Sequence, residues 1–515
     1  MAHLHHEQEL FKKRYEELCN GKDQLPCLGR LLQRTARMVP NNTVLFYEDT
    51  SLTYLQLYYY ATQLSKKIQS LGVKPRDRVI LLYENTPEFY IGYFGIVQVG
   101  AIIVPLNTFL QEKEITHILD DAQPSLIVVS STLLAMVQAA AESRSIMLLT
   151  EKDMSYGPVP AVLTNFEVMD LSANEMAALL YTSGTTGTPK GVMLSSKNIF
   201  TNVLQGIARF ELQYRDRVFA VLPLFHSFAQ NTCIWSSIFN GSSIILVPKI
   251  DRRAILKGLS KKPTILLGIP TLFGLLCLMK TAPIEHVRIC ISGGDALPDR
   301  IRSAFALIYR RKLCNGYGLT ETSPIISGDI DDELTCTSNV GMPVVGMTCV
   351  IKDETGHTVP QGQIGQLWVK GDNVMLGYYN APEMTESILK DGWLSTGDLA
   401  YFDRKKRLVI TGRYKDLIIH KGFNIYPQEI ENIIMLHADV IRAAVIGKPD
   451  AAHGEIPIAY VQLKQENKNI VEQLNALCAK NIAVYKIPRQ FMCSIDQLPV
   501  TATGKVDKKA LRKLI

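Results

Sequence analysis

The stretch TYLQLYYYATQLSKKIQSLGVKPRDRVILLYENTPEFYIGYFGIVQVGAIIVPL, residues 53–106, decides the fold class. Apolar residues recur every three or four positions in its first part and later gather into short runs, the patterns of amphipathic helices and buried strands. The predicted elements are a helix from Thr53 to Gly72, a strand over 78–84, a helix from Asn85 to Gly100 and a strand over 101–106. Strands joined by helices through short links pair in parallel, which predicts an α/β fold with helices packed on the sheet faces.

The alternation continues downstream and then changes character twice. Four further buried strands are predicted at 216–222, 243–248, 264–268 and 287–292. After about residue 337, glycines and polar turns separate short apolar runs, which predicts antiparallel strands. The end of the chain has the size of one small α+β domain, with helices predicted at 427–436 and 470–480 and strands at 440–447 and 456–463.

Composition excludes several classes of protein. The 515 residues are 47% hydrophobic and 20% charged, which excludes a disordered or fibrous chain, and a net charge of +6 is too small to indicate a nucleic-acid-binding surface. The ten cysteines form no C-x-x-C pair, so we expect buried thiols in a reducing compartment rather than a zinc site. The longest apolar runs, 90–106 and 264–279, are interrupted by Gln98 and Pro270, and we expect core elements rather than membrane spans.

The segment YTSGTTGTPKGVMLS, residues 181–195, has the composition of an anion-binding loop. Its glycines let the backbone approach a phosphate closely, and consecutive backbone N–H groups in a turn hold anions. It is not a P-loop, because Lys190 is followed by Gly191 and not by Ser or Thr. Its hydroxyls and its single cation therefore predict a phosphate site of another kind.

This loop and six further motifs resemble those of the adenylate-forming enzymes, a superfamily of acyl-CoA synthetases, peptide-synthetase adenylation domains and luciferases. The motifs are LPLFHSF (222–228), SGGDALP (292–298), NGYGLTETSP (315–324), DGWLSTGDLAYFD (391–403), TGRYKDLIIHKGFNIYPQEIE (411–431) and LPVTATGKVDKKALRK (498–513). Their order and spacing match over roughly residues 30–515, and KGFNIYPQEIE looks most like the fatty-acyl and medium-chain CoA ligases. The resemblance implies a large domain of doubly wound mixed sheets with a β-barrel-like subdomain (1–411), a hinge (412–416) and a small mobile α+β domain (417–515).

The resemblance implies a reaction in two steps and assigns residues to each. A carboxylate attacks the α-phosphate of ATP to give an acyl-adenylate, and the thiol of coenzyme A then displaces AMP. The implied nucleotide-binding residues are Thr182, Ser183, Gly184, Thr185, Thr186, Gly187, Lys190, Gly294, Asp295, Ala296, Asn315, Gly316, Tyr317, Gly318, Thr320, Asp398 and Arg413. Tyr317 would stack on adenine, Asp398 would accept the ribose hydroxyls, and Glu321 and Thr185 would bind Mg²⁺.

Catalysis and acyl transfer are implied to depend on four more residues. Lys505, with Thr320, Glu321 and His226, would act at the carboxylate and the α-phosphate, since a desolvated cation there lowers the barrier. Lys415 occupies the family's hinge, and Gly422 would line the pantetheine tunnel after the small domain rotates.

The acid is the least constrained part of the prediction. The implied pocket is apolar and lacks a charge for an amino acid's amine: it consists of Phe228, Ala229, Ile234, Trp235, Leu267, Ile269 and Leu272. We expect a fatty or related apolar carboxylate of medium to long chain in a cytoplasmic enzyme, and peripheral membrane contact would suit such a substrate. A carrier-protein thiol as acceptor stays an alternative, and so does a nucleotide-binding regulator without turnover.

Overall fold

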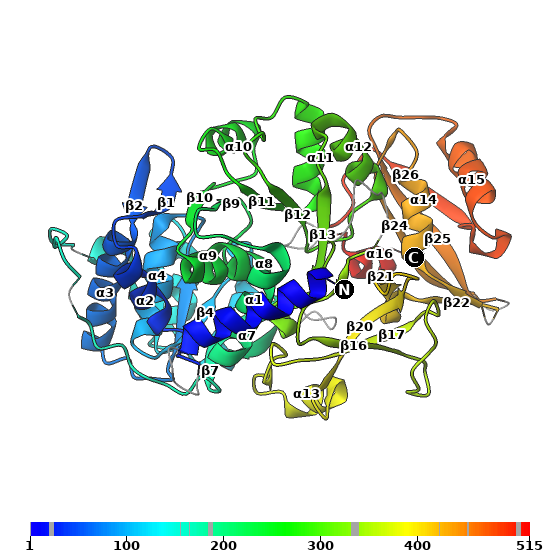
Figure 1. The fold of residues 1–515 in the computed structure, drawn as a ribbon. Coiled ribbons are helices and arrows are strands. Elements are labelled where there is room, and N and C mark those ends of the chain that lie inside the picture. The colour runs from blue at the N-terminus through cyan, green and yellow to red at the C-terminus, as the bar shows by residue number, and fades with distance from the viewer. Residues whose placement is uncertain are drawn as a thin grey trace.

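The computed structural model describes residues 2–19, 25–154, 156–163, 165–183, 189–330, 339–421, 423–450, 453–500 and 506–514. Figure 1 shows a large α/β body formed by most of the chain and a smaller domain formed by its C-terminal part. The described strands form four sheets, two in the α/β body, one between it and the smaller domain, and one in the smaller domain.

The first sheet carries the phosphate-loop segment at one side. Its order is β18 (Gly377–Tyr378), β8 (Pro189–Ser195), β7 (Met176–Ser183), β4 (Ile102–Pro105), β3 (Arg78–Leu82), β5 (Leu126–Val129) and β6 (Met147–Leu149). The strands from β7 to β6 are parallel, whereas β8 and β18 run antiparallel. The β7–β8 hairpin therefore holds the loop at the carboxyl end of the parallel part of the sheet.

The second sheet supplies most of the other motifs. Its order is β15 (Met342–Pro343), β14 (Ile325–Gly328), β13 (Leu313–Gly318), β12 (Ile289–Ser292), β11 (Ile265–Gly268), β9 (Arg217–Ala220), β10 (Ser243–Leu246), β1 (Thr43–Tyr47) and β2 (Thr50–Thr53). Pairing is parallel from β1 to β13 and antiparallel at both edges. Both sheets are thus mixed, as the sequence predicted.

Helices lie on both faces of each sheet and separate the two. Buried side chains of α2 (Arg30–Met38), α3 (Tyr54–Ser70), α4 (Pro87–Gln98), α7 (Ser196–Phe210) and α9 (Ser236–Asn240) join strands of both sheets in one apolar cluster. The outer face of the second sheet is covered by α10 (Arg252–Leu259), α11 (Pro270–Met279) and α12 (Asp299–Tyr309), and that of the first by α5 (Glu112–Ala122) and α6 (Leu134–Glu142). Residues 53–106 predicted the packing of helices on the sheet faces, and the family resemblance implied the doubly wound arrangement that the structure has.

The helix and strand predictions agree with the structure to within a few residues. Thr53 caps α3, accepting the N–H of Gln56 while the Gln56 side chain accepts the N–H of Thr53. The two long apolar runs form α4 with β4 and β11 with α11. Among the described helices none combines the length and the apolarity needed to cross a membrane, and the nine described cysteines are free thiols.

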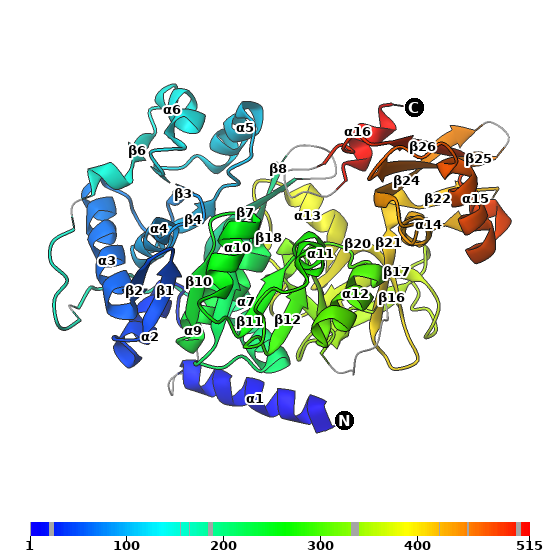
Figure 2. The same ribbon diagram turned by 90° about the horizontal axis from the view of Figure 1, so that it is seen from above.

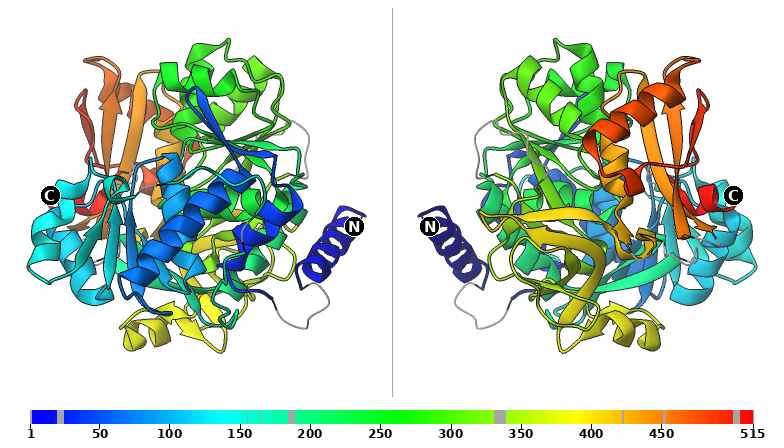
Figure 3. Two further views of the ribbon diagram at one scale, coloured as in Figure 1. Left: turned by 90° about the vertical axis from the view of Figure 1, so that its left-hand side faces the viewer. Right: turned by 90° about the vertical axis from the view of Figure 1, so that its right-hand side faces the viewer.

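The chain after residue 339 forms the other two sheets. The first of them consists of antiparallel strands, namely β16 (Thr348–Lys352), β17 (Gly365–Lys370), β20 (Trp393–Phe402), β19 (Leu389–Lys390) and β21 (Leu408–Arg413). The helix α13 (Pro382–Ile388) lies in the same part of the chain. The smaller domain contains β22 (Ile418–His420), β23 (Phe423–Ile425), β24 (Val440–Asp450), β25 (Gly454–Leu463), β26 (Gln490–Ser494), α14 (Pro427–Ile434), α15 (Ile470–Asn481) and α16 (Lys508–Arg512). Its sheet has its own apolar cluster with α14 and α15, and Figure 3 shows it beside the α/β body.

An N-terminal helix, α1 (Ala2–Cys19), was not predicted. It lies along the outside of the α/β body and crosses α7 (Figure 1, Figure 2). A fully buried ion pair joins them, with Glu7 Oε2 3.0 Å from Arg209 Nη2. Glu7 Oε1 accepts the N–H of Val345 at 3.1 Å, and Arg209 donates to the carbonyl of Pro343 at 2.7 Å. The pair therefore fastens α1 to both α7 and the edge of the second sheet.

Candidate active site

The predicted site residues lie where neighbouring parallel strands end. His226 follows β9, Gly294 follows β12, and Thr320 follows β13, three strands of one sheet. The carboxyl ends of parallel strands meet at the same edge, where open α/β sheets bind ligands. The topology thus brings together motifs that are about a hundred residues apart in the sequence.

The stem of the phosphate loop is an antiparallel pair. Thr182 pairs with Lys190 and Ser183 with Pro189, so the ends of β7 and β8 fix both sides of the turn. Lys190 is half-buried, and its Nζ lies 5.0 Å from the ring centroid of Tyr378. The predicted residues Gly184, Thr185, Thr186 and Gly187 lie outside the described residues, and so does the predicted Thr185 metal ligand.

Tyr317, Asp398 and Arg413 form a hydrogen-bonded cluster. The Tyr317 hydroxyl donates to Asp398 Oδ2, and Arg413 Nε lies 2.9 Å from Asp398 Oδ1. Asp398 and Arg413 are direct partners across the β20–β21 ladder, and Arg413 also donates to the carbonyl of Thr396. Burial, and then the Asp398 charge, raise the pKa of the Tyr317 phenol, which therefore stays protonated and donates.

The turns around this cluster require glycine for different structural reasons. A Cβ on Gly318 would lie 1.9 Å from the carbonyl oxygen of Pro324, so only glycine fits there. Gly294 has a φ of +77°, which favours glycine, and the segment Gly294–Ala296 is exposed. Asn315 is buried and donates its amide to the carbonyl of Asn339. Gly318 and Asn315 therefore shape the backbone, whereas Gly294, Asp295 and Ala296 are accessible to a ligand.

Thr320 and His226 approach each other from adjacent loops. The Thr320 and Ser227 hydroxyl oxygens are 3.0 Å apart. His226 caps the short helix α8 (Ser227–Ala229), where its Nδ1 accepts the N–H of Phe228 at 3.2 Å. The neutral ring therefore carries its proton on Nε2.

Glu321 is the carboxylate that could hold Mg²⁺. It lies half-buried in the 3₁₀ turn Thr320–Thr322, and its Oε1 accepts the Tyr378 hydroxyl at 2.8 Å. Mg²⁺ commonly binds one or two carboxylates together with substrate phosphates. Lys190, which contacts the same tyrosine as Glu321, is a cation that suits a triphosphate. The residues present therefore fit the implied metal.

Most of the predicted acyl pocket is filled by the protein itself. Ala229, Ile234, Trp235, Leu267 and Leu272 are at most 2% exposed and pack in the core. Only Phe228 and Ile269 are half-buried and remain open to a substrate. The Phe228 ring lies against Gly293, where a Cβ would come within 3.2 Å of it. The predicted wall thus reduces to Phe228, Ile269 and the glycine turn after β12.

Comparison with known proteins places the chain in a family. The AMP-binding enzyme model matches residues 32–379, and the model of the AMP-binding enzyme C-terminal domain matches residues 429–505. The long-chain-fatty-acid–CoA ligase of Bacillus subtilis is 32% identical, with 94% of each chain covered. The chain belongs to the AMP-binding enzyme family. This confirms the adenylate-forming superfamily and its acid–thiol ligase type, as the motifs implied.

Two solved structures show how well the fold matches other members of this family. An anthranilate–CoA ligase in complex with anthranoyl-AMP has a TM-score of 0.88 and 28% identity, covering 95% of this chain and 97% of its own. An o-succinylbenzoate–coenzyme A synthetase of Bacillus subtilis with ATP and magnesium has a TM-score of 0.85 and 26% identity, covering 94% of this chain and 99% of its own. Family members with this fold thus act on quite different acids.

Three predicted residues of the C-terminal motifs remain. Lys415 lies in the 3₁₀ turn Tyr414–Asp416, where desolvation and the nearby cations Arg413, Arg512 and Lys190 lower the pKa of its ammonium. The predicted Gly422 and Lys505 lie outside the described residues.

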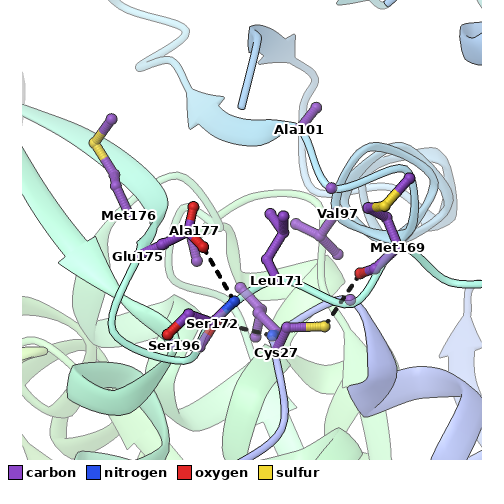
Figure 4. Close-up of a pocket in the computed structure, with 13 residues that line it drawn as sticks. Cys27, Val97, Ala101, Met169, Leu171, Ser172, Glu175, Met176, Ala177 and Ser196 are labelled. Atoms are coloured by element: carbon purple, nitrogen blue, oxygen red, sulfur yellow. Dashed lines mark hydrogen bonds between the residues drawn. The ribbon is translucent and has the colours of Figure 1, made fainter. Parts of the chain in front are cut away.

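A separate hollow lies far from this edge. Cys27, Val97, Met169, Glu175 and Ser196 are among its lining residues (Figure 4). The Cys27 thiol donates to the Met169 carbonyl, and Ser196 accepts the N–H of Leu28. Because β7 starts here and ends at the phosphate loop, this hollow is at the opposite end of the strand from the site and does not receive the acid.

Sequence reasoning missed Tyr378 and Ser227. Tyr378 is brought in by β18, whose pairing with β8 joins residues almost 200 positions apart. Ser227 lies within the motif LPLFHSF, but nothing in the sequence assigns it a role. Its hydroxyl contact with Thr320 depends on the distance between two loops, which no local motif reveals.

Proposed function

We propose that this chain is an ATP-dependent acyl-CoA synthetase that activates an apolar carboxylate of medium to long chain. The observation that carries the proposal is that Lys190, on β8 of the first sheet, and Glu321, after β13 of the second, both contact Tyr378. The neighbouring Thr320 contacts Ser227, next to the half-buried Phe228. A cation, a hydroxyl and a carboxylate suit a metal-bound triphosphate, and the apolar surface suits an uncharged acyl group. ATP, Mg²⁺ and coenzyme A are the reactants and cofactor of this class.

The first step joins the acid to AMP. A carboxylate oxygen attacks the α-phosphorus, the bond to the bridging oxygen breaks, and pyrophosphate leaves with the electron pair. Lys190 would stabilise the charge on the leaving group, and the Thr320 hydroxyl would donate to an α-phosphate oxygen. Mg²⁺, when bound at Glu321, neutralises charge on the phosphates. Tyr317 and Asp398 would hold the adenine and the ribose.

The second step transfers the acyl group. The sulfur of coenzyme A attacks the acyl carbon, the carbon–oxygen bond to AMP breaks, and the thiol proton goes to AMP or solvent. We propose that His226 lies at the border between the acid and the thiol. Both steps use one site, so we propose Lys415 as the pivot that brings first Lys505 and then Gly422 to it.

The choice of a fatty acid rests on the pocket and on one group of relatives. Amino-acid-activating relatives carry an aspartate after the corresponding strand, whereas this chain continues there with Ser227, Phe228 and Ala229, so this segment offers no carboxylate to an α-amine. Some long-chain enzymes carry an aromatic gate at the position where this chain has Gln230, which disfavours very long chains. Gln230 is fully buried and donates to the carbonyl of Phe225. The B. subtilis relative is named for long-chain acids, whereas other family members are named for anthranilate and o-succinylbenzoate.

A panel of acids tests the proposal. Pyrophosphate release and thioester formation should be measured with straight-chain acids of short, medium and long chain, with anthranilate and with an α-amino acid. We expect the highest kcat/KM with a medium or long chain and thioester formation with free coenzyme A. A preference for an aromatic acid would contradict the substrate class, and pyrophosphate release without any acid preference would contradict the enzyme class.

Lys505 provides a second test, directed at the mechanism. Lys505→Ala should reduce adenylation by ~10²-fold or more, by analogy with the loss of one transition-state donor. Thioester formation from supplied acyl-adenylate should be reduced far less, since that step does not need the cation. Lys509→Ala removes a charge from the same basic tail and is the matched control. Equal loss in both half-reactions would contradict the role proposed for Lys505.

A further inference from the structure

Tyr378 touches both charged groups that the triphosphate needs. Its hydroxyl donates to Glu321 Oε1 at 2.8 Å, and its ring centroid lies 5.0 Å from Lys190 Nζ, within the range of a cation–π contact. The side chain is 7% exposed, so both contacts are made largely out of water. One neutral side chain therefore serves an acidic and a basic partner at once.

The backbone around Tyr378 is held from both sides. Tyr378 pairs with Val192 of β8, and Tyr379 donates its N–H to the carbonyl of Gly191, next to Lys190. Met375 donates its N–H to the carbonyl of Glu321. The segment from Met375 to Tyr379 therefore spans the distance from the β8 lysine to the carboxylate after β13, and the position of Tyr378 follows from pairing that does not depend on a ligand.

We propose that Tyr378 is a positioning residue that keeps Lys190 and Glu321 apart and oriented before the nucleotide binds. This inference rests on the proposed function, because it assigns Lys190 to the phosphates and Glu321 to Mg²⁺. A lysine and a carboxylate at close range attract each other strongly where water is scarce. If they paired directly, the triphosphate and the metal would have to break that pair, whereas a ring that contacts the ammonium and a hydroxyl that fixes the carboxylate leave both charges available.

The two contacts predict different effects for two substitutions. Tyr378→Phe keeps the ring over Lys190 and removes the hydrogen bond to Glu321, so only the metal side of the site loses its orientation. Tyr378→Leu removes both contacts and lets the lysine and the carboxylate approach each other. Tyr379→Phe is the matched control, since the adjacent tyrosine packs in a different apolar cluster, on the other side of the strand.

Nucleotide-binding experiments test the positioning role of Tyr378 without requiring turnover or knowledge of the acid. Calorimetry should use the full chain and an ATP analogue with a methylene group between the α- and β-phosphates, over a series of Mg²⁺ concentrations. For Tyr378→Phe we expect the Mg²⁺ concentration for half-maximal tightening to rise ~10-fold or more, the effect of one hydrogen bond to a charged group. Metal-free binding should change less than about 2-fold with Tyr378→Phe and weaken at least about 5-fold with Tyr378→Leu, roughly one lost cation contact.

A double substitution separates positioning from simple destabilisation. In a Glu321→Gln background, Tyr378→Phe should have no further effect on Mg²⁺ dependence, because the hydroxyl acts through that carboxylate. Circular dichroism and thermal unfolding should confirm that each variant folds, and Tyr378→Met, which also removes the ring and the hydroxyl, replaces Tyr378→Leu if the latter does not fold. The proposal is overturned if Tyr378→Phe and Tyr379→Phe show the same Mg²⁺ dependence, or if the effects of Tyr378→Phe and Glu321→Gln add fully. Neither result depends on which acid the enzyme activates.

Discussion

Two arginine–carboxylate pairs with almost the same distance have different surroundings. Glu7 and Arg209 meet at 3.0 Å with both side chains 0% exposed, whereas Arg413 and Asp398 meet at 2.9 Å with side chains 43% and 5% exposed. The first pair fastens α1 to α7 and the edge of the second sheet. The second lies between Tyr317 and the turn Tyr414–Asp416, the proposed hinge.

The difference in exposure indicates a difference in role. A buried pair is expensive to form and very damaging to break, since the partner left behind stays charged without water. A pair whose guanidinium reaches solvent can lose one partner at little cost to the fold, because water replaces it. We therefore expect the Glu7–Arg209 pair to determine stability and the Asp398–Arg413 pair to determine nucleotide binding.

The largest expected effect comes from breaking the buried pair. Arg209→Met leaves the Glu7 carboxylate buried without its cation and should destabilise the fold by about 3–5 kcal/mol. Urea-induced unfolding should show this as a lower midpoint. The double variant Glu7→Gln, Arg209→Met should recover much of the loss, because the glutamine oxygen still accepts the N–H of Val345. A double variant no more stable than Arg209→Met would contradict the role of the uncompensated charge.

The second effect concerns the partly exposed pair, in which Arg413 reaches solvent and Asp398 is buried, and should be seen in binding. Asp398→Asn keeps the shape of the side chain but removes the charge proposed to accept the ribose hydroxyls. Hydrogen bonds to charged groups contribute about 1.5–3 kcal/mol, so the KM for ATP should rise ~10-fold or more. The unfolding midpoint should stay near that of the wild type, since Arg413 can turn to water. A large loss of stability with an unchanged KM would reverse the comparison.

The same two pairs show what could be predicted from the sequence. Asp398 and Arg413 are fifteen residues apart on paired strands, in two recognisable motifs. The helix capped by Thr53 depends on residues close in sequence. Both features could therefore be predicted. Glu7 and Arg209 are 202 positions apart, and Tyr378 reaches Glu321 through the pairing of β18 with β8. Such contacts depend on how strands are ordered in a sheet, which the local periodicity of apolar residues does not encode. The acyl pocket was predicted too large for a similar reason, because a residue's place in a motif does not reveal whether core packing already covers it.

The smallest expected effect concerns a third pair, at the hinge. Arg512 Nη2 of α16 lies 2.6 Å from Asp416 Oδ1, with side chains 37% and 13% exposed, so the pair is intermediate between the other two. Pairs of this exposure contribute at most about 1 kcal/mol, which corresponds to a change of no more than ~5-fold in an equilibrium. Because the pair joins the proposed hinge to the last helix, Arg512→Gln should alter the balance between the two orientations of the small domain. Adenylation and thioester formation should then change in opposite directions, each by about 2- to 5-fold, with an unchanged unfolding midpoint. Single-turnover pyrophosphate release and thioester formation from supplied acyl-adenylate measure the two rates, and Lys513→Gln is the control for charge in the same helix end. If both rates fall together, the pair acts on the stability of the small domain and not on its orientation.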